Sequence, residues 1–346
     1  MKLLFLILLF APVALADDWE DFTNNLATDL APLITLFGEQ LTKQFLSESI
    51  SYLDNIIFAL SPLGVLTAVV SLIRVCGSSS LKAFIGRAQE GPAEAESELL
   101  PCVSGSTAEL FNDGGISRVF GRPKILEIVA VEEKDSATGE SSVELQTLRG
   151  VLGSDAWKIK GSSQNTHPDD LLEGPELDTP NLSLNKGIRR RDQFWFYCVA
   201  VVGAILQIGV IIYAVVTVYI VPGSFKVDGK AVPKYAFPLY IIGTVFLFMG
   251  MMNSAILIGR SSHNYTLVPN KPSKVYWLQP GNQVVGDQVF NAFLAVNAEP
   301  LDSMSYIKSR RGRLGKNQSI ETYATISLTM VGFIFQFIGR EGCIAQ

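Results

Sequence analysis

The chain contains several long apolar runs, which are separated by stretches rich in polar and charged residues. Four of the runs lie at residues 53–75, 194–221, 237–259 and 320–338. A helix rises about 1.5 Å per residue, so roughly 20 apolar residues cover the hydrocarbon core of a bilayer. The pattern therefore predicts four transmembrane helices, of which the last is the shortest.

Two further patterns precede the first run. Residues 1–16 hold one lysine, an unbroken apolar stretch and a small-x-small ending, which is typical of a cleaved secretory signal peptide, with an uncleaved anchor as the alternative. Residues 17–52 are acidic, and their leucines and phenylalanines from Leu26 to Phe45 recur at helical spacing. We expect an amphipathic segment outside the cytosol, either on the membrane surface or in a small lumenal subdomain.

Small residues and one proline mark the run at 53–75. Pro62 predicts a kink within a continuous helix, because proline removes a backbone donor. Ser61, Gly64 and Ala68 share one helical face, which favours close packing of another helix. A packing role and a hinge role both fit this pattern.

Basic residues orient the spans. Segments 76–193 and 260–319 have lysine and arginine at both flanks, so both are expected in the cytosol, with 222–236 and the tail 339–346 outside. Three lysines within 222–236 argue mildly against this orientation. Two arginine clusters are candidate contacts for anionic lipid, with a plain topology role as the alternative. They are Arg189, Arg190 and Arg191, and Arg310, Arg311 and Arg313.

The first cytosolic loop is expected to hold a small α+β module at about 81–151. A capping-box sequence at 106–109 predicts a short helix, and residues 124–131 and 143–148 predict two strands. Residues 161–185 are polar and predict a flexible linker. The expected fold class is mainly α: a polytopic membrane protein with about four transmembrane helices and a small α+β cytosolic insertion.

Composition and motifs do not indicate an enzyme. Of 346 residues, 48% are hydrophobic and 18% charged, which is typical of a multi-pass membrane protein. The cysteine spacing fits no metal site, the two histidines have no predicted partner, and phosphate-binding, serine-nucleophile and zinc-protease motifs are absent. We predict no catalytic, cofactor-binding or metal-binding residue and no nucleic-acid partner, and the patterns do not indicate an oligomeric state.

Polar side chains inside the spans are the remaining candidates. Gln207, Asn253 and Gln336 are expected to meet in a tight bundle and to hydrogen-bond between helices, with the lining of a transport path as the alternative. The third span also places Gly243, Gly250 and Ser254 along one face. We therefore expect a non-enzymatic membrane scaffold, sensor or interaction protein of the secretory pathway or plasma membrane. Its expected partners are membrane lipids and a protein at the cytosolic loops, and a transporter or channel component is the alternative.

Several multi-residue runs carry a resemblance to a known group. They include LDNIIFALSPLGVLTAVVSLIRVCG, STAELFNDGGISRVFGRPKILEIV, NLSLNKGIRRR and WLQPGNQVVGDQVF. They resemble the membrane region of uncharacterised filamentous-fungal multi-pass membrane proteins, in some of which that region precedes ankyrin repeats. No 33-residue repeat occurs in this chain. The resemblance implies a membrane location and either a short member or a truncated form, and it supplies no activity and no functional residues.

Overall fold

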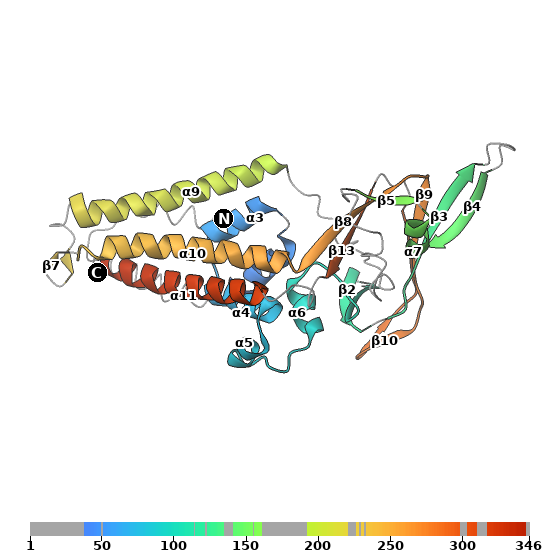
Figure 1. The fold of residues 1–346 in the computed structure, drawn as a ribbon, viewed down its shortest axis with the longest axis horizontal. Helices are drawn as coiled ribbons and strands as arrows, with labels where there is room; N and C mark the ends of the chain where they lie inside the picture. The colour runs from blue at the N-terminus through green and yellow to red at the C-terminus, as the bar shows by residue number, and fades with distance from the viewer. Residues whose placement is uncertain are drawn as a thin grey trace.

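A computed structural model describes most of the chain between residues 38 and 343. The described residues are 38–49, 51–113, 115–121, 123–134, 141–154, 156–160, 192–220, 226–227, 230–231, 233–297, 303–309 and 317–343. The predicted signal peptide, most of the acidic segment and the predicted linker at 161–185 lie outside them. The molecule is elongated, with a helical bundle at one end and a β domain at the other (Figure 1).

Three long helices run side by side along the bundle (Figure 1). They are α9 (Gln193–Val215), which continues as a π-helical turn (Val216–Ile220), α10 (Ala236–Gly259) and α11 (Asn317–Cys343). Within the described residues, these are the helices long and apolar enough to cross a membrane. A short hairpin of β6 (Lys226–Val227) and β7 (Lys230–Ala231) lies between α9 and α10 in the sequence.

The expected first span is not a continuous helix. Residues 53–75 form two short helices, α3 (Tyr52–Leu60) and α4 (Val65–Cys76), of 9 and 12 residues. At about 1.5 Å per residue they reach roughly 14 and 18 Å, and neither covers a hydrocarbon core of about 30 Å. Pro62 and Gly64 break the helix instead of kinking it, because Gly64 adopts a left-handed conformation with φ of 66°. The prediction of four transmembrane helices is therefore wrong, and three candidate spans remain.

A helix at residues 38–48 packs against this break. The hydroxyl of Thr42 donates to the carbonyl oxygen of Leu63 at 2.9 Å, and the rings of Phe45 and Phe58 stack with centroids 5.4 Å apart. A Cβ at Gly64 would lie 2.4 Å from the Thr42 hydroxyl oxygen, so glycine is needed there for space as well as for φ. The break is thus held by specific contacts.

The β domain combines strands from both loops. The first loop contributes α5 (Ser79–Phe84), α6 (Pro92–Leu99), β1 (Thr107–Asn112), β2 (Gly115–Phe120), β3 (Leu126–Lys134), β4 (Ser141–Thr147), α7 (Leu148–Gly153) and β5 (Trp157–Lys160). The second contributes β8 (Ser262–Pro269), β9 (Ser273–Gln279), β10 (Gln283–Val285), β11 (Gln288–Phe290), β12 (Phe293–Val296) and β13 (Met304–Ser309).

Antiparallel pairing interleaves the two loops. One sheet has the order β12-β9-β3-β4 and another has the order β13-β8-β5. Because β3 pairs with β9 and β5 pairs with β8, both loops lie on the same side of the bundle. The expected fold class, mainly α with a small insertion, is therefore wrong: the protein combines a helical bundle with a substantial α+β domain.

The capping-box prediction at 106–109 is also wrong. Residues 107–112 form β1, which pairs with β2 as a hairpin in which Asn112 lies opposite Gly115. The Asp113-Gly114 pair between these strands is a strong hairpin sequence, and it outweighs the weaker helix-start pattern. Pairing with a neighbouring strand stabilises this segment more than a local helix-start sequence does.

The core of the β domain is shared by both sheets. Val129 and Val275 from the four-stranded sheet cluster with Trp157, Leu267 and Tyr306 from the three-stranded sheet, and all of them are buried. The indole N–H of Trp157 also donates to the hydroxyl of Ser273 at 3.2 Å, which links one sheet to the other. The domain is therefore one packed unit.

Small residues bring α10 and α11 into close contact. On α10, Gly243 and Gly250 lie on the buried face, and on α11 Gly332 and Gly339 lie opposite. A Cβ at Gly332 would lie 2.4 Å from the backbone nitrogen of Leu247. The two backbones approach closely because no side chain separates them at these points, and small residues allow the same close approach in pairs of membrane helices.

A matched pair of glycine substitutions tests this packing. We expect Gly332→Ala to destabilise the protein by about 1–3 kcal/mol, because the added methyl group overlaps the backbone of α10. Gly209→Ala on α9 has nothing within 4 Å and is expected to be neutral or to stabilise, because alanine has the higher helix propensity. Thermal unfolding of the detergent-purified full chain measures both, and equal effects would contradict the close packing.

Candidate functional site

The polar residues predicted inside the spans lie at separate helix contacts. Gln207 of α9 donates through its amide nitrogen to the carbonyl oxygen of Leu60 at 3.1 Å, where α3 ends. Gln336 of α11 donates to the hydroxyl of Thr244 on α10 at 3.2 Å. Asn253 is half-buried on α10. The structure thus joins each glutamine to a neighbouring helix and does not bring the three residues together.

The small residues predicted to share one face are separated by the helix break. Ser61 is exposed at the end of α3, Gly64 lies against Thr42, and Ala68 is fully buried on α4 in the cluster that includes α10. They contribute to packing as individual contacts. The arginines of the two predicted lipid-binding clusters, 189–191 and 310–313, lie outside the described residues.

A buried ionic cluster joins the bundle to the β domain. Arg74, in the last turn of α4, donates from Nε to Glu90 Oε1 at 2.7 Å and from Nη1 to Glu98 Oε2 at 2.7 Å. The side chains of Arg74 and Glu90 are only 2% and 3% exposed. Lys43, on the 38–48 helix, adds contacts to Glu98 at 3.4 Å and to Glu39 at 2.8 Å. We call these five residues the junction cluster.

Each member of the junction cluster stabilises the charge of its neighbour. The hydrogen bond from Arg74 lowers the pKa of Glu98 below its ordinary value, although partial burial opposes this shift. The hydrogen bond to Glu39 raises the pKa of Lys43. The position of Arg74 at the C-terminal end of α4 adds a favourable interaction with the helix dipole. From sequence, Arg74 indicated only the orientation of a span; its acidic partners lie 16 and 24 residues away and gave no local signal.

Helix α6 extends this connection into the β domain. Glu96, 1% exposed, accepts a hydrogen bond from the hydroxyl of Thr107 on β1. Arg118 on β2 donates to the carbonyl oxygen of Leu100 and pairs with Glu109 on β1 at 3.0 Å. One face of α6 therefore contacts the bundle through Glu98, and another contacts the β1–β2 hairpin.

The other side of the β domain presents an apolar surface. In the four-stranded sheet, residues that pair directly lie on the same face, and Leu278 pairs with both Leu126 and Leu294, while Ala130 pairs with Leu145. Six large apolar side chains on this outer face are between 38% and 66% exposed: Leu126, Val143, Leu145, Leu278, Leu294 and Val296. We call them the outer-face patch. Most antiparallel sheets with one solvated face carry polar residues there, so this patch is unusual.

The inner face of the same sheet buries a carboxyl group. Glu127 on β3 lies opposite Trp277 on β9, whose indole N–H donates to Glu127 Oε1 at 2.9 Å. Burial raises the pKa of Glu127 to about 7, and the indole hydrogen bond opposes this shift only partly. Its second oxygen has no hydrogen-bond partner among the described residues. A protonated carboxyl is the form that suits this position.

Two glutamines in the run WLQPGNQVVGDQVF act as backbone clamps. Gln279, 1% exposed, accepts from the N–H of Phe111 at 2.7 Å and donates to the carbonyl oxygens of Phe111 and Asn291. Gln283 likewise binds the N–H and the carbonyl oxygen of Lys124. This recognisable run therefore holds distant segments in place, and sequence reasoning missed that role because both partners lie more than 150 residues away.

Metal-binding geometry is not found among the described residues, where no group of three or more histidine, cysteine, aspartate or glutamate side chains is placed to hold an ion. Within the described part of the chain, Cys76, Cys102 and Cys198 form no disulfide.

Comparison with known proteins finds no matching family model, no matching curated protein and no matching solved structure. The resemblance to filamentous-fungal membrane proteins therefore stays a prediction. The outer-face patch and the junction cluster are the two features on which a functional proposal can be built.

The junction cluster predicts a non-additive pair of substitutions. Arg74→Met is expected to destabilise the protein by about 3–5 kcal/mol, because it leaves the buried Glu90 carboxylate without its partner. Combining it with Glu90→Gln is expected to restore more than half of the loss. A double-mutant cycle by thermal unfolding measures the coupling. Arg260→Met is the control, because its pair with Glu321 is exposed and contributes at most about 1 kcal/mol, and an equal loss there would contradict the special role of Arg74.

Glu127 predicts a defined pH dependence of stability. Its pKa is raised in the folded state, so between its ordinary value of 4.5 and about 7 the unfolded chain ionises while the folded chain stays protonated. The free energy of unfolding should therefore fall as the pH rises through this window, by up to about 3 kcal/mol, and this contribution should not change further above it. Glu127→Gln should remove that dependence. Unfolding at a series of pH values tests this, with the exposed Glu133→Gln as the control, and an unchanged pH slope in Glu127→Gln would refute it.

Proposed function

We propose that this protein is a non-enzymatic membrane scaffold that recruits a protein partner to the surface of a membrane of the secretory pathway or to the plasma membrane. In this proposal the three apolar helices anchor the chain, the β domain faces the cytosol, and the outer-face patch binds the partner. The observation that carries the proposal is the set of six exposed apolar side chains on one face of an ordered sheet. Exposed apolar patches of this kind mark interaction sites more often than chance exposure does.

The position of the patch favours a protein over lipid of the same membrane. The four-stranded sheet lies at the end of the molecule farthest from the bundle (Figure 1). Lipid that surrounds α9, α10 and α11 therefore does not extend to it. Exposed charges of both signs lie on the same face as the patch, Lys274 on β9 opposite Ala130 and Glu132 on β3 opposite Val143, and mixed apolar and charged side chains are expected at a protein interface.

The rigid attachment of the β domain supports a scaffold role. The junction cluster and α6 link the bundle to the β1–β2 hairpin, and α10 leads into β8 with only Arg260 and Ser261 between them. These short connections hold the patch in a fixed position relative to the bundle, so less conformational entropy is lost when a partner binds. The polar residues that would support a transporter, Gln207 and Gln336, have their hydrogen bonds satisfied between helices and do not favour that alternative.

Binding through the outer-face patch is tested by comparing two variants of the full chain. Leu145→Lys combined with Leu278→Lys introduces two charges into the patch, one on β4 and one on β9, and we expect at least a tenfold loss of the copurifying partner. Val289→Lys on β11 is the matched control, because this side chain is 57% exposed but belongs to a different two-stranded sheet. Quantitative mass spectrometry of affinity-purified protein from native membranes measures the partners.

Identification of one protein that is lost with the patch variant and retained with the control would support the proposal. An identical set of partners for wild type and both variants would overturn it. Thermal unfolding of each variant is compared first, so that a change in partner binding can be separated from a loss of folding.

A further inference from the structure

We propose that α5 and the residues that follow it, together 79–87, form a membrane-surface anchor that places Phe84 among the headgroups of an anionic bilayer. This inference is independent of the outer-face patch, which lies on a different part of the molecule. It assigns a lipid contact to residues that the sequence patterns marked only by their basic charge.

The contacts around α5 place it at one end of the bundle. The hydroxyl of Ser78, just before α5, lies 3.0 Å from the hydroxyl of Tyr323 in the second turn of α11. Cys76, which ends α4, lies with its sulfur 3.6 Å from the carbonyl oxygen of Leu257 near the end of α10. Figure 1 shows α5 to the side of the bundle, below the start of α11 and apart from the strands of the β domain.

Exposed polar and aromatic groups locate the membrane boundary at this end. Arg260, which directly follows α10, forms a solvent-exposed ion pair with Glu321 near the start of α11. Tyr323 lies two residues further along α11, about 3 Å deeper. Exposed Phe194, Trp195 and Tyr197 stand at the same end of α9. Aromatic belts of this kind occur at the level of the lipid headgroups.

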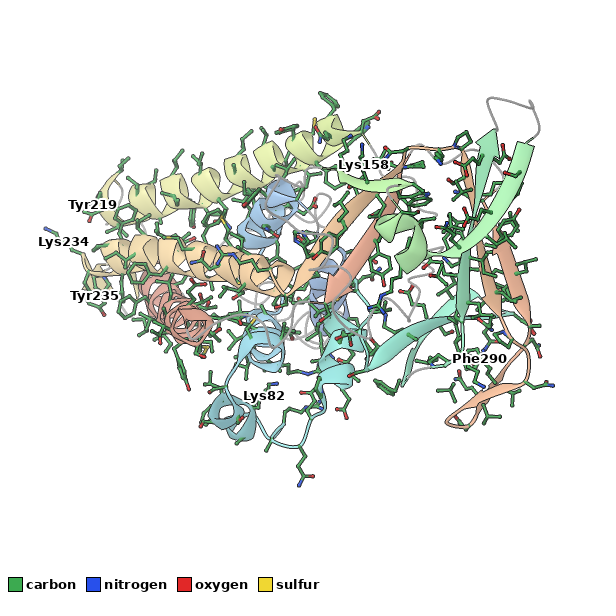
Figure 2. The ribbon with its side chains drawn as sticks, turned by 45° about the vertical axis from the view of Figure 1, so that its right-hand side comes forward. Lys82, Lys158, Tyr219, Lys234, Tyr235 and Phe290 are labelled. Carbon is green, nitrogen blue, oxygen red and sulfur yellow. The ribbon has the colours of Figure 1, made fainter. Side chains whose placement is uncertain are left out.

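A second aromatic group stands at the opposite end of the bundle. Tyr219 and Tyr235 are exposed there, beside Lys234 (Figure 2). From Tyr197 to Tyr219 along α9 the distance is about 33 Å at the helical rise, close to the thickness of a hydrocarbon core. The two belts therefore bracket a slab of bilayer thickness, and α5 lies at its β-domain side.

Helix α5 lies at the surface of the protein. None of its residues is buried, and Phe84 is 88% exposed, the highest value among the exposed large apolar side chains of the described chain. A six-residue helix without a buried face is not stabilised by packing in water. A lipid surface beside it would supply the missing apolar contact.

Charge selects the kind of lipid. Residues 77–89 contain Lys82 and Arg87 and no acidic residue, and Lys82 lies in the last turn of α5 (Figure 2). A phenylalanine flanked by cations is typical of segments that insert at an anionic membrane surface, where each basic residue adds attraction to the headgroups. Anionic phospholipid is therefore the expected neighbour of Phe84.

Photocrosslinking at position 84 tests the proposal in the full chain. Benzoylphenylalanine replaces Phe84 in protein reconstituted into vesicles of phosphatidylcholine alone or mixed equally with phosphatidylserine, and adducts are identified by mass spectrometry. The matched control replaces Phe120, a 54% exposed aromatic at the end of β2 in the β domain. We expect lipid adducts at position 84 and not at 120, with a severalfold higher yield in the serine-containing vesicles. The double variant Lys82→Gln, Arg87→Gln should remove that difference.

Adducts at position 84 no more frequent than at position 120, equal yields in the two lipid mixtures, or adducts to protein alone would each overturn the proposal. Thermal unfolding of Phe84→Asp serves as a check on folding, because an exposed side chain of this kind should change stability little.

Discussion

The buried guanidinium of Arg74 is the constraint around which the rest of the molecule is arranged. A charge that is 2% exposed must be neutralised and hydrogen-bonded, and Glu90 and Glu98 do both. Because these partners come from the segment that leads into the β domain, α4 cannot move away from α6 without uncovering an unpaired charge. The ionic contact therefore determines where the bundle ends and how the β domain is attached to it. Apolar packing alone would fix that relation less specifically.

Local sequence patterns predicted the helices that stand alone and failed where distant partners decide the structure. The spans at 194–221, 237–259 and 320–338 coincide with α9, α10 and α11 because a long apolar run needs no partner to be recognised as a helix. The run at 53–75 has the same composition, but Thr42 and Phe45 stabilise its break from outside it. The proline and the glycine are visible in the sequence. The sequence does not show that the helix at 38–48 packs against the break that they cause.

The β domain shows the same limit more clearly. The patterns at 124–131 and 143–148 predict two strands, which correspond to β3 and β4, but no pattern predicts β9, which pairs with β3 from about 150 residues away. The alternation in β9 is regular, with Ser273, Val275, Trp277 and Gln279 buried and Lys274 and Leu278 exposed. Because apolar residues occupy exposed as well as buried positions of β9, its sequence does not alternate between apolar and polar residues, and the strand is hard to predict. The outer-face patch could not be predicted either, because the sequence alone does not show whether an apolar residue of a strand faces a core or an open surface.

The three long helices differ in how they are held, and this difference bears on how the molecule functions. On α10, Gly243 and Gly250 lie against the backbone of α11, and on α11 Gly332 and Gly339 lie against the backbone of α10, so the two backbones meet closely at four points. In contrast, α9 exposes most of its apolar side chains and is held at two places: through Gln207 and Gly203 against Leu60 midway along the helix, and through Ala214 and Val218 in a small cluster towards its end. Since α10 leads into β8 through only Arg260 and Ser261 and packs closely on α11, this pair carries the β domain, and α9 is not part of that connection. This division suits the scaffold role that we propose, because the β domain with its outer-face patch is attached through the closely packed pair and not through α9.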